Sequence, residues 1–234
     1  MSKLSDRYRP KSLSEIVGQP MAHAVLFGWM QEPFGSCWLF RGAPGTGKTS
    51  TALAVAEELG CGDSCRIVPC SDLGVDKARE LVRALALSPM FGSGKWNILI
   101  LEELERLSPA CQQYLKVALE SLPCRAIVMA TSNDTTILDP ALIQRFTVLD
   151  YSHGADFAKS ANLRVAQVWL EETDGKPLPI GFDSWGMDSS GAYSLRLAYD
   201  RLQQNLLMLR AGVTPPTAAP TKSAPRSFVI GGGK

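Results

Sequence analysis

The sequence has few histidines, almost no net charge and no long hydrophobic run. It contains 2 histidines, and 24 Lys and Arg against 23 Asp and Glu give a formal net charge of +1. No run approaches the ~18 apolar residues of a membrane span, and residues 1–10 have no apolar segment typical of a leader peptide. A near-zero net charge excludes an overall field that recruits nucleic acid, so such a contact needs a local patch or several subunits. We therefore expect a soluble, cytoplasmic protein.

The scarcity of histidine also affects whether the cysteines can form a zinc site. The 6 cysteines are Cys37, Cys61, Cys65, Cys70, Cys111 and Cys124. The spacing of Cys61, Cys65 and Cys70 invites a zinc site, but structural zinc takes four ligands, and neither histidine lies nearby in the sequence. Reduced thiols are therefore favoured over bound zinc, although the spacing leaves zinc open.

Residues 42–49 form a glycine-rich loop of the sequence G-A-P-G-T-G-K-T, the pattern of a phosphate-binding P-loop. An apolar run at 36–40 precedes it and a helical segment at 50–59 follows it, which is the setting that this motif needs. Its backbone N–H groups would face the phosphates of ATP, Lys48 would reach the β- and γ-phosphates, and Thr49 would hold Mg²⁺. The expected nucleotide-binding residues here are Gly42, Ala43, Pro44, Gly45, Thr46, Gly47, Lys48, Thr49 and Ser50.

Two acids end the next strongly apolar segment. Residues 96–101 are typical of a strand buried on both faces, and we expect it beside the strand of the P-loop. Glu102 follows as the expected metal ligand, and Glu103 as the residue that orients or deprotonates the attacking water. Asp is usual where Glu102 stands, so the extra methylene predicts slow hydrolysis. The alternative is a charged surface end of a core strand.

Three further polar side chains are candidates for catalysis. Asn133 follows the next apolar strand, where it would hydrogen-bond the γ-phosphate or the attacking water, or else cap a turn. Arg145 is a candidate arginine finger that acts from a neighbouring subunit, and Arg196 is a candidate γ-phosphate sensor in the last helix. Either arginine alone is more often a surface salt-bridge residue.

Strands alternate with helices over most of the chain, which predicts a parallel α/β sheet with flanking helices, wound by right-handed connections. We expect a nucleotide-binding domain at residues 1–150, a small helical lid domain at 151–211 and a disordered tail at 212–234. Residues 3–20 are expected to form an extended arm. Strands are expected at 36–40, 66–70, 96–101 and 126–131, and helices at 21–32, 50–59, 75–87, from Ser108 onward, at 156–171 and at 194–209.

The order of these features resembles that of AAA+ ATPases, and specifically the small subunits of sliding-clamp loaders, of the replication factor C and bacterial clamp-loader type. The resemblance covers residues 7–209. It makes residues 42–49 the Walker A motif and 98–103 the Walker B motif, with Asn133 as first sensor, Arg145 as finger and Arg196 within the second-sensor segment. Residues 7–19 resemble the adenine-contacting segment of the family, which implies base contacts by Tyr8, Arg9, Pro10, Val17 and Gly18.

A second stretch that resembles the family implies a contact with DNA. Residues 69–79 are similar to the Asn-Ala-Ser-Asp stretch of clamp loaders, whose following helix touches DNA. The resemblance therefore implies that Arg79 contacts DNA. The alternative from the residues alone is a solvated helix face, which Arg79 shares with Arg83.

The sequence also departs from the family pattern. Pro69 replaces the asparagine that, in this family, keeps the catalytic glutamate inactive until DNA is bound. Glu102 replaces the metal-binding Asp, and Arg145 lies between Gln144 and Phe146 rather than in the family's Ser-Arg-Cys setting. We expect no helical collar of the kind that assembles the family's pentamer, so we expect any ring to be held by the ATPase domains or by other proteins.

The resemblance implies an ATPase of DNA replication that works as a homo- or hetero-oligomer on DNA or a DNA-bound protein, with a sliding clamp and primed DNA as partners. Two alternatives stay open. One is a nucleotide-dependent assembly module with slow or no hydrolysis. The other is an AAA+ protein that remodels a protein partner, which the near-neutral charge permits.

Overall fold

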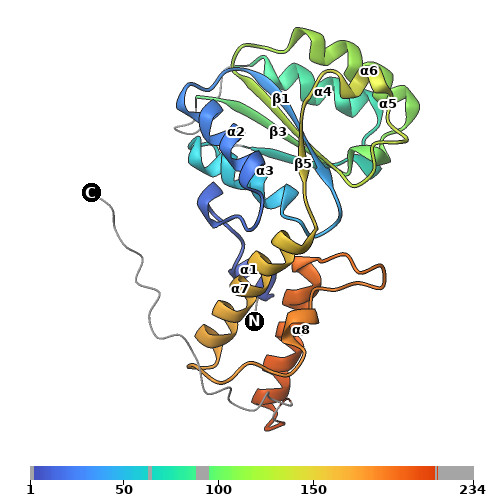
Figure 1. The fold of residues 1–234 in the computed structure, drawn as a ribbon. Coiled ribbons are helices and arrows are strands. Elements are labelled where there is room, and N and C mark those ends of the chain that lie inside the picture. Colours follow the sequence, from blue (N-terminus) through green and yellow to red (C-terminus); the bar gives the residue numbers. More distant parts are fainter. Residues whose placement is uncertain (1–2, 63–64, 88–94, 214, 216–234) are drawn as a thin grey trace.

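The structure is a computed structural model, and it describes residues 3–62, 65–87, 95–213 and 215. Its centre is a five-stranded sheet in which every neighbouring pair of strands is parallel (Figure 1). The strand order is β2-β3-β4-β1-β5. The strands are β1 (Ser36–Gly42), β2 (Arg66–Pro69), β3 (Asn97–Glu102), β4 (Ala126–Ser132) and β5 (Thr147–Tyr151). The expected parallel α/β fold is confirmed.

The sheet is covered by helices on both faces, because alternate residues of its inner strands are apolar on both sides. Leu99 and Val128 contribute to one core cluster, and Ile98 and Ile127 to the other. The first cluster is covered by α4 (Val75–Leu85), α5 (Pro109–Ala118) and α6 (Pro140–Ile143). The second is covered by α2 (Pro20–Gln31) and α3 (Lys48–Glu58). Because neighbouring strands are parallel, their carboxyl ends meet at one edge of this three-layer arrangement.

A third cluster lies below the sheet in Figure 1, among α1 (Leu4–Arg7), α7 (Ala155–Glu172) and α8 (Leu195–Arg210). Its large buried side chains include Phe157, Trp169 and Tyr193, and Leu4 joins them from the N-terminal segment. We propose that residues 151–211 form a lid domain around this cluster, with Tyr151 at the junction.

The N-terminal segment differs from the expected extended arm. It contains the one-turn helix α1 and a 3-10 turn at Leu13–Glu15. Leu4 and Leu13 are almost fully buried, in the lid cluster and in a sheet cluster respectively. Turns this short are stabilised by tertiary packing rather than by local propensity, so the sequence pattern does not reveal them.

The sheet also differs from expectation at two places. β4 lies between β1 and β3, so the strand that carries the acids is not beside the strand of the P-loop, as we had expected. β5 and α6 were not expected at all. β5 pairs with β1 at the edge of the sheet, and its Thr147 and Asp150 are exposed, so it lacks the apolar run of a strand that is buried on both faces.

Three of the remaining expectations concern the tail, membrane-spanning helices and a zinc site, and each can be compared only with the residues that the structure describes. Most of the segment 212–234, expected to be disordered, lies outside them. Within the described ranges, no helix has the length and apolar character to cross a membrane. The same ranges hold no group of three or more His, Cys, Asp or Glu side chains placed to bind a metal ion, so they offer no zinc site at Cys61, Cys65 and Cys70.

Candidate functional site

A cavity of about 860 Å³ opens at the carboxyl ends of the strands, between the sheet and the lid helices. This volume is within the range of ligand pockets, roughly 300–1,000 Å³. The expected nucleotide-binding residues that line it are Tyr8, Arg9, Pro10, Val17, Pro44, Gly45, Thr46, Gly47, Lys48, Thr49 and Ser50. Gly18, Gly42 and Ala43 are not among its lining residues. The cavity also takes in Glu102, Glu103, Asn133 and Arg196.

The loop between β1 and α3 depends on glycines in left-handed conformations. Gly47, with φ of 99°, is the N-cap residue of α3. Gly45 has φ of 78°, a conformation that side chains rarely adopt. The loop therefore turns its backbone into the N-terminus of α3, where free N–H groups and the helix dipole favour a phosphate.

Lys48 is the first residue of α3, directly after this loop, and is only 7% exposed. Its Nζ donates hydrogen bonds to the carbonyl oxygens of Gly42 and Ala43 and to Oδ1 of Asn133, at 2.7, 2.8 and 2.9 Å. Burial lowers the pKa of Lys48 to about 8, while nearby Glu105 and Glu103 oppose that change and Arg196 adds to it. The ammonium group is thus charged at neutral pH, and it lies against the carbonyl oxygens of the loop.

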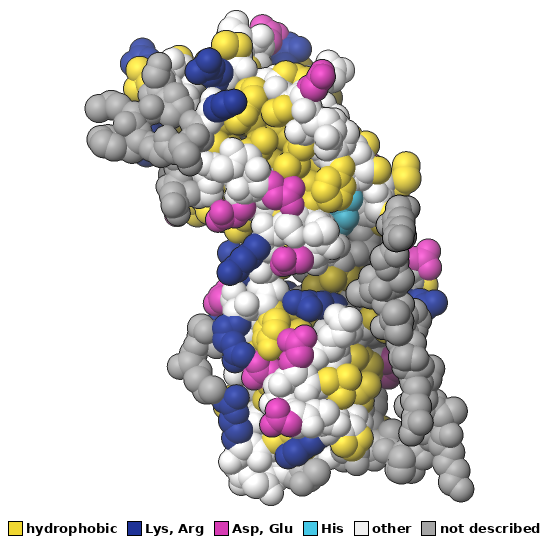
Figure 2. Space-filling view, turned by 90° about the vertical axis from the view of Figure 1, so that its left-hand side faces the viewer, with side chains coloured by type: hydrophobic (Ala, Val, Ile, Leu, Met, Phe, Trp, Pro, Cys, Tyr) yellow, Lys and Arg dark blue, Asp and Glu magenta, His cyan; other side chains and the backbone are white. Residues whose placement is uncertain are grey.

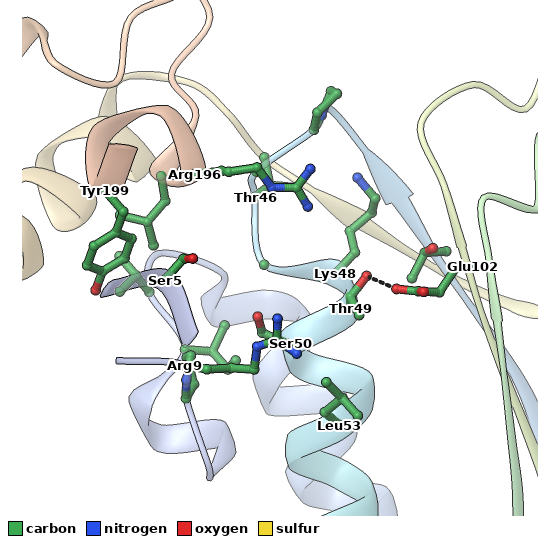
Figure 3. Close-up of a pocket in the computed structure, with 18 of the residues that line it drawn as sticks. Ser5, Arg9, Thr46, Lys48, Thr49, Ser50, Leu53, Glu102, Arg196 and Tyr199 are labelled. Atoms are coloured by element: carbon green, nitrogen blue, oxygen red, sulfur yellow. Dashed lines mark hydrogen bonds between the residues drawn. The ribbon is translucent and has the colours of Figure 1, made fainter. Parts of the chain in front are cut away.

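Thr49 and Glu102 meet beside Lys48. The hydroxyl of Thr49 donates to Oε1 of Glu102 at 3.1 Å, the contact drawn in Figure 3. A hydroxyl and a carboxylate oxygen are the ligand types that Mg²⁺ prefers, so these two side chains fit the ion. Glu102 reaches Thr49 although Asp is usual at its position. Thr49 and Glu102 would hold the ion, which would supply positive charge against the phosphates of ATP.

Glu103 follows β3 in a left-handed backbone conformation, with φ of 56°. Its N–H donates to Oγ1 of Thr131 at 3.2 Å, which ties this turn to β4. Its carboxylate pairs with Nε of Arg106 at 3.5 Å. A left-handed non-glycine residue costs about 1–2 kcal/mol. Glu103 and Glu102 both line the cavity.

Asn133 stands between Lys48 and a third acid. Its backbone N–H and its Nδ2 donate to Oε1 of Glu105, at 3.1 and 2.9 Å. Its Oδ1 accepts from Lys48. The side chain is therefore held from both sides rather than free to cap a turn.

The N-terminal segment brings aromatic and basic side chains to the far side of the cavity. The hydroxyl of Tyr8 donates to Glu172 of α7 at 2.8 Å, and the guanidinium of Arg164 lies 5.7 Å from the centre of the Tyr8 ring. Burial and Glu172 raise the pKa of Tyr8 to about 12. Gly18 packs against Phe157, where a Cβ atom would lie 2.8 Å from the ring. The segment thus joins the cavity to the lid helices.

The lid touches the P-loop directly. The N–H of Leu195 donates to the carbonyl oxygen of Gly45 at 3.1 Å. Arg196, one residue later at the start of α8, extends its guanidinium toward Thr46 and Lys48 in Figure 3. A cation placed here faces the same region as Lys48, as a phosphate sensor would.

Gly45→Ala should separate the lid from the loop. A Cβ atom on Gly45 would lie 2.0 Å from Oγ of Ser194, the N-cap residue of α8, and would also force alanine into a left-handed conformation. That conformation alone costs about 1–2 kcal/mol, so thermal denaturation should show a lower melting temperature. The matched control is Gly28→Ala within α2, where nothing lies within 4 Å and alanine should stabilise by ~1 kcal/mol. A Gly45→Ala protein as stable as the wild type would contradict this packing.

The two predicted arginines Arg79 and Arg145 also lie outside the cavity. Arg145 follows α6 and forms an ion pair with Glu120. Arg79 lies on α4, where it pairs with Asp76 at 2.7 Å and stacks over the ring of Tyr114 at 5.5 Å. The structure does not bring either arginine to the P-loop of its own chain, and their roles stay predictions.

Sequence reasoning missed Glu105, Arg106 and Arg164. Glu105 had a signal, since it is the third acid of the run Glu102, Glu103, Leu104, Glu105. Arg106 and Arg164 had none, because only the turn after β3 and the approach of α7 bring them to the cavity lining.

Residues 38–152 match the model of the family described as "ATPase family associated with various cellular activities (AAA)". Replication factor C subunit 3 of Blastobotrys adeninivorans is 28% identical over 212 residues, which are 88% of this chain and 61% of that protein. The replication factor C small subunit of Archaeoglobus fulgidus is 30% identical over 142 residues, which are 58% of this chain and 44% of that protein. The chain therefore spans from 44% to 61% of the length of these two relatives.

The fold is also similar to a solved structure. A variant of Thermotoga maritima RuvB superposes with a TM-score of 0.69 at 20% sequence identity, covering 90% of this chain and 69% of that one. At this identity the likeness concerns the fold alone.

Proposed function

We propose, from the match of residues 38–152 to the AAA ATPase family model, that the chain binds ATP with Mg²⁺ and hydrolyses it as an oligomer, in the manner of a clamp-loader small subunit. The observation that carries the proposal is the contact between Thr49 and Glu102 inside a cavity that Lys48 also lines. A P-loop with a carboxylate beside its threonine has the two halves of a metal-nucleotide site.

The division of labour follows from the side chains around that contact. Lys48 and Arg196 would bind the phosphates, and Thr49 with Glu102 would hold Mg²⁺. Glu103 would take the proton of the attacking water, because it lines the cavity next to Glu102 and, unlike Glu102, does not hydrogen-bond Thr49. Water would form its bond to the γ-phosphorus as the bond to the β–γ bridging oxygen breaks, leaving ADP and phosphate.

The adenine base would lie between the N-terminal segment and the lid. Tyr8, Arg9, Pro10 and Val17 line this side of the cavity, together with Tyr199 of α8. Aromatic rings and an arginine plane offer stacking surfaces for a flat base. Because Tyr8 is fixed to α7 through Glu172, base binding here would also hold the lid against the sheet.

Oligomeric action is proposed from the position of Arg145. The residue is outside the cavity of its own chain and 33% exposed, so it can reach a nucleotide only in a neighbouring subunit. The two relatives described above are named as subunits of replication factor C. We extend to this chain the proposal of an assembly that acts on primed DNA and a sliding clamp.

DNA binding is proposed to involve α4 rather than a broadly basic surface. The face shown in Figure 2 mixes Lys and Arg with Asp and Glu side chains, and the net charge of the chain is +1. Arg79 on α4 pairs with Asp76, whose side chain is 96% exposed. Such a pair contributes about 0–1 kcal/mol, so a phosphate can replace the carboxylate at little cost.

Arg79→Ala should weaken DNA binding and make it less sensitive to salt. Loss of one phosphate contact lowers the slope of log K against log salt by about 0.9. Binding of labelled primed DNA at several salt concentrations measures both effects, with Lys159→Ala, an exposed lysine of α7, as control. An unchanged affinity and slope would return Arg79 to an ordinary solvated helix face.

A second candidate is an assembly module in which ATP binding matters and hydrolysis is slow. It is favoured by Pro69, which lines the cavity opposite Glu102 in the register of β2 and β3 and has no side-chain donor to hold Glu103. Single-turnover ATP hydrolysis with and without primed DNA separates the two candidates. The first expects faster turnover with DNA, whereas the module expects assembly with ATP and no stimulation. Stimulation by a protein target instead would favour a remodeller.

A further inference from the structure

The position of β4 explains why Asn133 contacts both halves of the site. β4 lies between β1 and β3, so the residue after it stands between the P-loop that follows β1 and the acids that follow β3. Asn133 accepts from Lys48 on one side and donates twice to Oε1 of Glu105 on the other.

These partners determine which way the amide of Asn133 faces. A lysine ammonium only donates hydrogen bonds and an ionised carboxylate only accepts them. Nδ2 must therefore face Glu105, and Oδ1 must face Lys48. Reversing the amide would place a donor against the ammonium and an acceptor against the carboxylate, so the orientation follows from the chemistry of its neighbours.

Glu105 is itself held firmly. It lies in the 3-10 turn Leu104–Arg106, and Leu104 and Leu107 on either side of it are buried in the core. Its Oε2 is buried and makes no hydrogen bond within the described part of the chain. A half-buried carboxylate with one unpaired oxygen costs stability. The presence of Glu105 at this position is therefore better explained by its effect on the side chain that it orients.

We propose that Glu105 is a positioning residue, which fixes the amide of Asn133 so that its oxygen faces Lys48 and the attacking water. This rests on the proposed function. When the phosphates of ATP draw Lys48 toward them, Oδ1 can accept a hydrogen bond from the water whose other proton passes to Glu103. Asn133 thereby orients the water as an acceptor, and Glu105 acts on the water through Asn133.

The kinetic test compares Glu105→Ala with Glu105→Gln. Both hydrogen bonds from Asn133 go to one oxygen of Glu105, and glutamine keeps such an oxygen while it loses the charge. Glu105→Ala should lower kcat by about 10²-fold, the order expected for a misplaced catalytic group, with the Kd of ATP changed less than about threefold. Glu105→Gln should restore most of kcat. The control, Glu32→Gln, removes an exposed carboxylate at the end of α2.

The double variant Glu105→Ala with Asn133→Ala should be no slower than Asn133→Ala alone, because Glu105 acts through that side chain. Additive losses would overturn the proposal, as would an unchanged kcat in Glu105→Ala. Equal losses in the Ala and Gln variants would assign the effect to charge and overturn it too. Melting temperatures of the same variants distinguish a loss of kcat from a loss of folding.

A readout without turnover keeps this test apart from that of the proposed function. The side-chain amide resonance of Asn133, assigned by its loss in Asn133→Ala, should shift in Glu105→Ala and stay close to the wild-type position in Glu105→Gln. That result with no ATP hydrolysis in the wild type would refute the proposed function and retain the positioning. An amide resonance unmoved in Glu105→Ala would refute the positioning even in an active ATPase.

Discussion

Lys48→Ala is expected to weaken ATP binding by about 10²- to 10⁴-fold. Two charge-assisted hydrogen bonds, to the β- and γ-phosphates, contribute about 1.5–3 kcal/mol each, and about 1.4 kcal/mol corresponds to tenfold. The ammonium is placed for this exchange, because its present acceptors are the loop carbonyls of Gly42 and Ala43 and the amide of Asn133. Titration with a fluorescent ATP analogue measures the affinity directly.

The alanine variant leaves those two carbonyl oxygens without the ammonium, so its melting temperature must be measured as well. Lys95→Ala is the matched control. Lys95 is exposed and precedes β3, at the edge of the sheet opposite the cavity, so its removal should leave ATP affinity unchanged. A folded Lys48→Ala protein that binds ATP as tightly as the wild type would refute the P-loop assignment.

The parallel sheet and the P-loop could be predicted from sequence because their signals are local. Ile98, Leu99 and Ile100 form an unbroken apolar run, which indicates a strand buried on both faces. Gly47 ends the loop after a strand and Lys48 begins a helix, the context that the phosphate-binding pattern needs. Each of these inferences required only neighbouring residues.

The order of the strands could not be predicted in this way. It depends on which strands pair across the sheet, and pairing leaves no mark within a single strand. For that reason the sequence indicated an acid near the P-loop but not that Asn133 would lie between Lys48 and Glu105. Arg106 likewise reaches the cavity through the left-handed turn at Glu103, which no spacing pattern announces.

Arg145 could be predicted as a candidate but not located. Its ion pair with Glu120 joins two segments of the same chain, and the cavity that it is proposed to serve would belong to a neighbouring subunit. The Nε atom of Arg145 is buried without a hydrogen bond within the described residues, so part of its donor set is unused in this pairing. An exposed ion pair of this kind contributes about 0–1 kcal/mol. A nucleotide phosphate can therefore displace Glu120 at small cost.

Arg145→Ala and Glu103→Gln are each expected to abolish most ATP turnover while ATP binding is retained. An arginine finger contributes about 10³- to 10⁵-fold to kcat, and loss of a general base about 10²- to 10⁴-fold. Arg125→Ala is the control for loss of an arginine, since Arg125 is exposed and lies just before β4 at the opposite edge of the sheet. Single-turnover hydrolysis and ATP titration together separate lost chemistry from lost binding.

Mixing the two inactive proteins is the decisive measurement. An Arg145→Ala subunit keeps Glu103, and a neighbouring Glu103→Gln subunit can supply Arg145 to that site. If subunits mix at random, about a quarter of the interfaces should then be complete, and turnover should reappear in that proportion. A finger that acts within its own chain predicts no recovery at any mixing ratio. If Arg145 only pairs with Glu120, Arg145→Ala is already active before the two proteins are mixed. The three outcomes differ without any assumption about subunit number, because each depends only on whether one subunit completes the site of the next.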